Sequence, residues 1–281
     1  MVKLHKAFAV ATQYWRPRED YLKQIVEAIE NKVKDRDFVA ISEKAISTAI
    51  GSLVDESLVQ PSWSARFIAK YWMRFVWPYI LGPLCRLRRK TIRRLRAYPI
   101  EGGAHKQVAL IHGGFLQALM QGSEGAIDGS NLPYSYVSLP LDNAQQIAEK
   151  IHQQIMSKLD RRVTVVIVDT DKTYSLKGFH FTPRPKPLKG IHSFGGFLAY
   201  LMGRVLKLEK RATPLAVSGS KVTIEEAIEI AKIANRSRGS GAGRTVWDMA
   251  KTFRVPLTNV TWEMLDEVKH KPIVIIRPER E

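Results

Sequence analysis

Short apolar runs and helical periods alternate along this chain. Ala7 to Thr12 has the pattern of a β-strand, and Arg18 to Val33 then carries apolar residues at helical spacing. A second short apolar run, Asp37 to Ile41, predicts a buried strand. It is followed directly by Ser42, Glu43 and Lys44, and polar residues at the end of a buried strand often face a functional site.

The middle of the chain predicts two more strands. Val108 to Ile111 is a short apolar run, and Val163 to Val168 is a continuous run of branched residues that ends in Asp169 and Thr170. Between them, Asn143 to Leu159 presents isoleucine and leucine at every fourth position, which predicts a helix.

Helical patterns account for much of the rest. Ser62 to Arg96 predicts two helices broken near Pro78 and Pro83, because proline lacks the N–H that a helix needs. Further helices are expected at Ser193 to Leu208 and at Thr223 to Ala234, where Thr223 is a suitable N-cap. The proline-rich segment Gly178 to Gly190 is expected to be a loop.

These elements, together with the absence of an internal repeat, predict one α+β unit spanning residues 1–281. A smaller lobe within residues 176–250 is compatible with the same pattern. With 281 residues and 45% hydrophobic residues, the chain has the size and composition of a folded globular protein.

Composition narrows the environment of the protein. The lone cysteine, Cys85, excludes an internal disulfide and a cysteine-based zinc cage within one chain, which favours a reducing, cytoplasmic location. The most hydrophobic stretch, Phe67 to Cys85, contains Lys70 and Arg74 as well as two prolines, so we do not expect it to span a membrane.

The chain is strongly basic, with 44 lysines and arginines against 27 acidic residues, a net charge of +17. Such a charge attracts phosphates, polycarboxylates, nucleic acid or anionic lipid. The predicted helix Leu84 to Arg96 carries many of the arginines. It is compatible with a solvated surface helix, with a face for an acidic ligand or partner, or with a nucleic-acid contact.

Two polar segments are candidates for chemistry. The first is the turn Gly125 to Asn131, with Asp128 and Asn131 at its centre; a structural Asx turn has the same pattern. The second is Asp169 with Thr170 at the end of an apolar strand. Two hard oxygen donors in that place suit Mg²⁺ or Mn²⁺ bridging nucleotide phosphates.

The order of these motifs resembles that of the coenzyme F-420-0:γ-glutamyl ligase family. The chain contains Ala-Ile-Asp-Gly-Ser-Asn, then Leu-Pro-Leu-Asp, an amphipathic helix and Val-Val-Ile-Val-Asp-Thr. These are similar to the family's Ala-Gly-Ile-Asp-x-Ser-Asn, Leu-Pro-x-Asp and Ile-x-Asp-Thr. Asp37 to Gly51 looks like the family's early nucleotide-contacting turn. The resemblance covers roughly residues 5–175, with a weaker match over 215–245.

The resemblance implies an intertwined mixed-sheet α+β fold, commonly a homodimer. It implies an enzyme that uses GTP or ATP with Mg²⁺ or Mn²⁺ to activate a carboxylate of an anionic cofactor, F-420-0 or a related folate or pterin, for attack by L-glutamate. Transferred by motif, the metal positions are Asp128, Asp169 and Thr170. The nucleotide positions are Ser42, Glu43, Lys44, Thr48, Asn131, Arg236 and Ser237.

The chain departs from the family pattern in three places. Asp171 to Tyr174 follow the Asp-Thr pair where the family has a Gly-Arg-Pro stretch, Thr48 stands where relatives often have lysine, and Asn235 to Ser237 replace a Met-Gly-Gln helix end. Gly239 to Gly243, flanked by arginines, could be a phosphate-binding loop or a flexible linker.

Two other classes of function compete with the ligase. One is a nucleic-acid-binding protein built on the basic helix, and the other is a peripheral membrane protein with Trp72, Trp77 and Tyr79 at the interface. A binding module has no need of Asp169 and Thr170 at the end of an apolar strand, so the sequence favours the enzyme.

Overall fold

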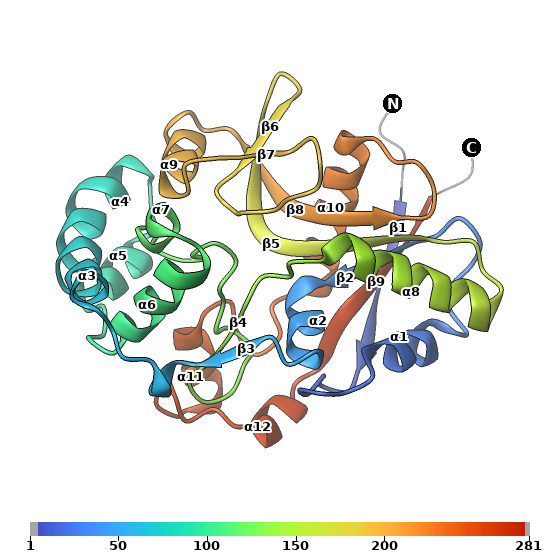
Figure 1. The fold of residues 1–281 in the computed structure, drawn as a ribbon, viewed down its shortest axis with the longest axis horizontal. Helices are drawn as coiled ribbons and strands as arrows, with labels where there is room; N and C mark the ends of the chain where they lie inside the picture. The colour runs from blue at the N-terminus through green and yellow to red at the C-terminus, as the bar shows by residue number, and fades with distance from the viewer. Residues whose placement is uncertain (1–4, 279–281) are drawn as a thin grey trace.

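A mixed β-sheet forms the centre of the protein in the computed structural model, which describes residues 5–278 (Figure 1). The strands are β1 (His5–Thr12), β2 (Phe38–Ser42), β3 (Leu53–Asp55), β4 (Tyr136–Ser138), β5 (Thr164–Leu176), β6 (Phe179–Thr182), β7 (His192–Ser193), β8 (Glu209–Ser218) and β9 (His270–Pro278). The main sheet has the order β1-β9-β2-β5-β6-β7, and β8 pairs with β5. Strands β2 and β5 are parallel, whereas β9 is antiparallel to β1 and β2. The α+β class and the mixed sheet predicted from the sequence are therefore confirmed.

The helices fall into a group around the sheet and a group beside it. Their bounds are α1 (Tyr21–Ile29), α2 (Glu43–Ala49), η1 (Glu56–Leu58), α3 (Trp63–Phe67), η2 (Ile68–Leu81), α4 (Gly82–Leu84), α5 (Arg89–Arg96), α6 (Gly102–His112), α7 (Phe115–Ala118), α8 (Ala144–Leu159), α9 (Phe197–Val205), α10 (Ile224–Arg238), α11 (Val246–Phe253) and α12 (Trp262–Asp266). No helix of residues 5–278 has the length and apolarity that crossing a membrane would require.

Alternation along the central strands gives the sheet two buried faces. Val39 and Ile41 of β2 share one core with α1 and α8, and Phe38 and Ala40 of the same strand share the opposite core with Ile230 of α10. Successive side chains of a strand point to opposite faces, so continuous apolar strands such as β2 and β5 must be covered on both. Residues 176–250, where the sequence allowed a smaller lobe, contribute strand β8 to this sheet and helix α10 to the layer that covers one of its faces.

A second core lies in a helical lobe, built from α3, η2 and α4 to α7, at the opposite end of the molecule from the chain termini (Figure 1). Trp77 is fully buried there, and its indole N–H donates to the carbonyl of Leu119 at 2.7 Å. The indole N–H of the half-buried Trp72 donates to the same carbonyl at 2.9 Å. Because both indoles anchor the lobe, the proposed interfacial role of Trp72 and Trp77 is wrong.

Two further expectations for this region are corrected by the structure. Val108 to Ile111 is part of helix α6 and not a strand, because a short apolar run is equally compatible with a buried helix face. The helix also continues through Pro78: η2 is a π-helix, in which the N–H of Gly82 bonds to the carbonyl of Trp77. The break comes instead at Arg86, in the left-handed conformation, and the basic helix starts only at Arg89.

A buried ionic cluster ties α6 to the segments beside it. The His105 ring lies 2.5 Å from a Glu56 carboxylate oxygen and 3.2 Å from one of Glu124, and Lys106 donates to Glu124 at 2.6 Å. Burial alone would lower the pKa of His105, but Glu56 and Glu124 raise it to about 10. Burial would likewise raise the pKa of Glu124, but Lys106 and His105 lower it to about 2.

Replacing Trp77 with alanine should destabilise the protein by about 3–5 kcal/mol, because it removes a buried indole and leaves a cavity. Trp63→Ala is the matched control: this indole is 80% exposed, and its removal should change the free energy of unfolding by less than about 0.5 kcal/mol. Urea denaturation of both variants measures the difference, and equal losses would contradict the burial of Trp77.

The His105 cluster makes stability depend on pH. Since the folded pKa of His105 is raised to about 10, its contribution is complete below the unfolded value near 6.5 and is lost as pH rises toward 10. We expect wild-type protein to lose roughly 3 kcal/mol over this window. His105→Gln should lack that loss and be less stable at pH 6. His152→Gln, outside the lobe, should keep the wild-type pH profile in urea titrations.

Candidate functional site

A cleft with a volume of about 1850 Å³ runs between one edge of the sheet and the helical lobe. Strands β2 and β5 are parallel and in register from Phe38–Thr164 to Ser42–Val168, so both deliver the residues that follow them to the same edge. The pairing of β5 with β8 is irregular between Asp169 and Lys172. Such a bulge redirects side chains, and here it brings Asp169, Thr170 and Asp171 to the wall of the cleft.

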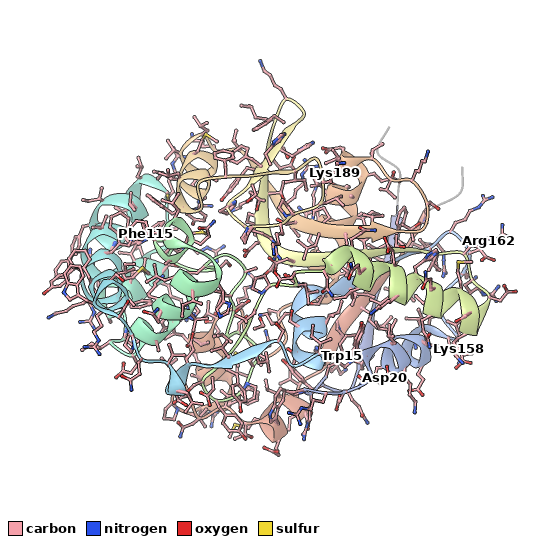
Figure 2. The ribbon with its side chains drawn as sticks, in the orientation of Figure 1. Trp15, Asp20, Phe115, Lys158, Arg162 and Lys189 are labelled. Carbon is pink, nitrogen blue, oxygen red and sulfur yellow. The ribbon has the colours of Figure 1, made fainter. Side chains whose placement is uncertain are left out.

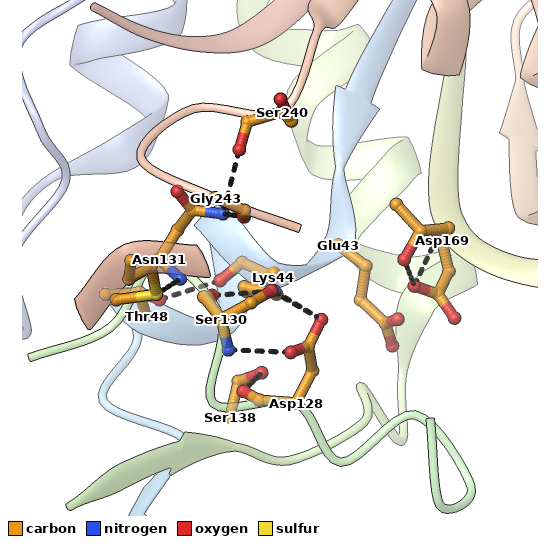
Figure 3. A network of polar contacts seen from close by, with 12 residues as sticks. Glu43, Lys44, Thr48, Asp128, Ser130, Asn131, Ser138, Asp169, Ser240 and Gly243 are labelled. Atoms are coloured by element: carbon orange, nitrogen blue, oxygen red, sulfur yellow. Dashed lines mark hydrogen bonds and ion pairs between the residues drawn. The ribbon is translucent and has the colours of Figure 1, made fainter. Parts of the chain in front are cut away.

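The first side-chain network in the cleft joins α2 to the predicted Asp128 turn (Figure 3). Lys44 forms an ion pair with Asp128 and donates to the Ser130 carbonyl at 2.8 Å and to its hydroxyl at 2.7 Å. The backbone N–H of Ser130 donates to Asp128 at 2.7 Å. Burial would raise the pKa of Asp128, but Lys44 and Ser130 hold it below its ordinary value. Asp128 is therefore a carboxylate at neutral pH.

The second network fixes the glycine run that follows α10. The Asn131 side chain accepts from the N–H of Ala242 at 2.7 Å and donates to the Gly243 carbonyl at 3.0 Å. A methyl group at Gly241 would lie 2.5 Å from the Asn131 amide oxygen. Glycine is required at this point because the backbone approaches Asn131 closely. The glycine run therefore packs against Asn131 beside the cleft, and its binding of phosphate stays a prediction.

The third network is buried behind the cleft wall and centres on a guanidinium group. Arg184 is 1% exposed, and its two terminal nitrogens donate to Glu43 at 2.6 and 2.7 Å. One of them also donates to Asp169 at 2.5 Å. The chain leaves the sheet edge along β5, turns back along β6, and so places Arg184, which lies between Pro183 and Pro185, beside Asp169.

Acidic and basic side chains lie close together in this part of the cleft. Asp171 is buried, and its Oδ2 has no hydrogen-bond partner among the described residues. Burial, and then the Asp169 carboxylate, raise the pKa of Asp171 well above its usual value. Burial lowers the pKa of Lys172 and of Arg238, and nearby carboxylates oppose the shift in both. This is a partly desolvated site in which electrostatic interactions are strong.

Most of the residues selected from the sequence line this cleft, and the rest do not. Those in its wall are Ser42, Lys44, Thr48, Asp128, Asn131, Asp169, Thr170 and Arg236. The Glu43 carboxylate lies behind the wall, where it accepts hydrogen bonds from Arg184 and, at 2.8 Å, from the backbone N–H of Leu141. Ser237 lies in the last turn of α10 and does not line the cleft either. Proximity in sequence to a site residue did not place these two side chains in the site.

The sequence patterns do not select Arg184, Asp171 or Lys172 as site residues, and they indicate Arg238 only as one of the arginines that flank the glycine run. The signal for Arg184 is its place between two prolines, in the segment Gly178 to Gly190 that the sequence predicts to be a loop. That prediction is wrong for Phe179–Thr182, which form strand β6. Lys172 and Arg238 lie far apart in the chain, on β5 and at the end of α10. Only the packing of α10 against β5 brings both into one cleft.

The donor set was tested for a divalent metal. Among residues 5–278 no three His, Cys, Asp or Glu side chains form a group that could hold a metal ion. A magnesium ion bound with a nucleotide needs only one or two protein carboxylates, because phosphate oxygens and water complete its shell. Asp128, Asp169 and Thr170 offer oxygen donors in the cleft wall, where Asp128 is paired with Lys44 and Asp169 with Arg184. The unpartnered Oδ2 of Asp171 is a further buried oxygen in the same wall.

Comparison with known proteins agrees with the motifs that line the cleft. The chain is 34% identical to the uncharacterized protein MJ1361 of Methanocaldococcus jannaschii over 290 aligned positions, which cover 98% of this chain and 97% of the relative. Residues 9–245 match the sequence profile of the F420-0:Gamma-glutamyl ligase family, and this span includes all the strands of the main sheet except β9 and the first half of β1. The chain therefore belongs to the F420-0:γ-glutamyl ligase family.

Proposed function

We propose that this protein is a nucleotide- and metal-dependent ligase that adds L-glutamate to an anionic cofactor acceptor, F420-0 or a related folate or pterin. The observation that carries the proposal is the cleft, where Asp128, Asp169 and Thr170 face Lys172 and Arg238. Acidic residues for a metal and basic residues for phosphates in one partly desolvated cavity are what phosphoryl transfer to a carboxylate requires.

The proposed reaction has two steps. A carboxylate oxygen of the acceptor attacks the terminal phosphorus of GTP or ATP, which forms an acyl phosphate and releases the nucleoside diphosphate. The amine of glutamate, having lost a proton, then attacks the acyl carbon; the amide bond forms and phosphate leaves. A bound Mg²⁺ or Mn²⁺ would neutralise phosphate charge in the first step.

The chain's own residues would bind and orient these groups. The first part of the glycine run, Gly239 to Gly241, would offer backbone N–H groups to phosphates, and Arg236 and Arg244 beside it would offer cations. The cleft extends to Tyr98 and Trp247, and the Arg94 guanidinium lies 5.5 Å from the Trp247 ring centre. We place the planar ring of the acceptor against this aromatic wall and its acidic tail near Arg94. The homodimer implied by the family resemblance stays a prediction.

The first experiment measures thermal stabilisation by GTP, ATP and GDP with and without Mn²⁺. A ligand at a hundred times its Kd adds about 2.7 kcal/mol, which should raise Tm by roughly 5–10 °C. Asp169→Asn should abolish the metal-dependent part, whereas Asp160→Asn, at the exposed end of α8, should keep it. No stabilisation by any nucleotide would contradict the proposal. If stabilisation occurs, glutamate incorporation into F420-0 tests the acceptor.

A glycine pair tests the loop at the cleft. Gly241 and Gly239 both have positive φ, so alanine at either position should cost about 1 kcal/mol of stability. A methyl group at Gly239 meets nothing within 4 Å, whereas at Gly241 it collides with Asn131. Gly241→Ala should therefore weaken GTP binding at least about tenfold in calorimetric titration relative to Gly239→Ala. Equal affinities would remove the loop from the site.

A further inference from the structure

Aromatic side chains run in an exposed row along the outer side of helices α3 and η2. The row, here called the aromatic ladder, consists of Trp63, Phe67, Tyr71, Phe75 and Tyr79, each 45–80% exposed. Ring centres of successive members from Trp63 to Phe75 lie 5.5, 5.2 and 6.4 Å apart. The ladder belongs to the helical lobe, at the pole of the molecule farthest from the chain termini (Figure 1).

Further apolar side chains are exposed in the same part of the lobe. Ile80 directly follows Tyr79 and is 63% exposed, and Leu84, one turn further along, is 48% exposed. The apolar interior of the lobe is already filled on the other side of η2 by Met73 and Trp77. A contiguous exposed apolar surface of this kind marks an interaction site, because a folded monomer gains nothing by exposing it.

The segment that carries the ladder has charges of one sign, and of its cations Lys90 and Arg94 pair with Asp248 of α11. Residues 57–100 contain ten lysines and arginines and no acidic residue, so this segment carries +10 of the net +17 and the rest of the chain 17 − 10 = +7. Cations lie directly on the ladder: the Arg96 guanidinium is 4.7 Å from the Tyr79 ring centre, and the Lys70 ammonium is 5.2 Å from that of Tyr71. The partner of this surface must therefore be both negatively charged and able to take up aromatic rings.

We propose that the aromatic ladder and the arginines of α5 dock this protein onto the surface of an anionic lipid bilayer. Tryptophan, tyrosine and phenylalanine partition into the boundary between headgroups and acyl chains, and lysine and arginine beside them pair with anionic headgroups. The helix would lie parallel to the bilayer plane. Ile80 and Leu84, which have no use for a polar ligand, would insert with the rings.

The alternative occupants fit the surface less well. A second copy of the chain would bring two segments of charge +10 together, and like charges in an interface oppose association. A single-stranded nucleic acid needs free ring faces and a groove that follows its backbone. Here neighbouring rings such as Trp63 and Phe67 stack on each other, with 24° between their planes, on the outer side of a helix beside exposed aliphatic side chains.

Docking would also orient the active cleft with respect to the bilayer. Helix α5 carries Arg94, which lines the cleft, and on other faces the exposed Arg89, Arg93 and Arg96. The lobe that forms one wall of the cleft is thus the same lobe that would rest on the lipid. This inference does not depend on the proposed ligase activity, since attachment can be measured without substrate.

The test is flotation of the full chain with vesicles of phosphatidylcholine alone and with vesicles in which about a third of the lipid is phosphatidylserine. We expect binding only to the second kind, weakened by high salt. Phe67→Gln, Tyr71→Gln and Phe75→Gln combined should reduce the partition coefficient at least about tenfold. A matched control combines Met156→Gln, Leu176→Gln and Phe179→Gln, which are similarly exposed elsewhere, and should bind as wild type does.

Two triple variants that remove the same amount of positive charge at different places measure the electrostatic contribution to membrane binding. Replacing Arg88, Arg89 and Arg93 with glutamine should weaken binding by roughly tenfold to a hundredfold, because each cation near an anionic surface adds to the affinity. Replacing Lys150, Lys158 and Arg162, which are exposed at the far end of the sheet, lowers the net charge equally and should have a much smaller effect. Unchanged thermal unfolding of each variant verifies that it folds.

Several outcomes would overturn the proposal. Binding to neither vesicle, equal loss in the ladder variant and its control, or equal binding to neutral and anionic lipid would each do so. Sedimentation that shows a wild-type dimer converted to a monomer by the ladder variant would assign the surface to a second copy. Ladder-dependent binding of a single-stranded oligonucleotide, with no lipid binding, would assign it to nucleic acid.

Discussion

The buried guanidinium of Arg184 is the constraint on which the architecture of the cleft depends. It bridges Glu43, at the start of α2, and Asp169, in the bulge of β5. Removing three charges from water is costly, and the cost is offset only when the geometry is good, as in the two short bonds to Glu43. Because these bonds work only in one arrangement, they fix the ends of β2 and β5 and the entry of the Pro183 segment relative to one another.

The same logic of fixed polar contacts extends across the cleft. Lys44 holds Asp128, and Asn131, three residues further along, holds the backbone of Gly243. The predicted metal turn and the glycine loop are thereby parts of one network, which leads from α2 to the end of α10 (Figure 3). A site assembled from such contacts is preorganised, so binding a polyanion need not order a flexible loop at the same time.

The helical lobe combines an inner and an outer surface of different character. Inside, Trp72 and Trp77 share the Leu119 carbonyl and the His105 cluster neutralises its own charges. Outside, the aromatic ladder and Arg89, Arg93 and Arg96 of α5 are exposed. Side chains project from the outer edge of the lobe, on the left of Figure 2. The lobe thus lines the cleft through residues such as Arg94 and Leu95 of α5, and presents the aromatic ladder of α3 and η2 to the surroundings.

The sequence alone determined part of the central sheet, without β8 and β9, and part of the site. Apolar runs predicted β1, β2 and β5, helical periods predicted α1, α8 and α10, and the motifs around Asp128 and Asp169 predicted two residues of the cleft and the family. These features could be predicted because the pattern of a strand, a helix or a motif lies within a short stretch of neighbouring residues. Only tertiary packing decided that Val108 to Ile111 is helical, because a short apolar run fits either state. Packing likewise decided that Trp77 is buried while Tyr79 is exposed. It also decided that Arg184 and Arg238 join the site from distant parts of the chain. The physical reason is that burial and charge pairing depend on neighbours in space, which the sequence does not reveal.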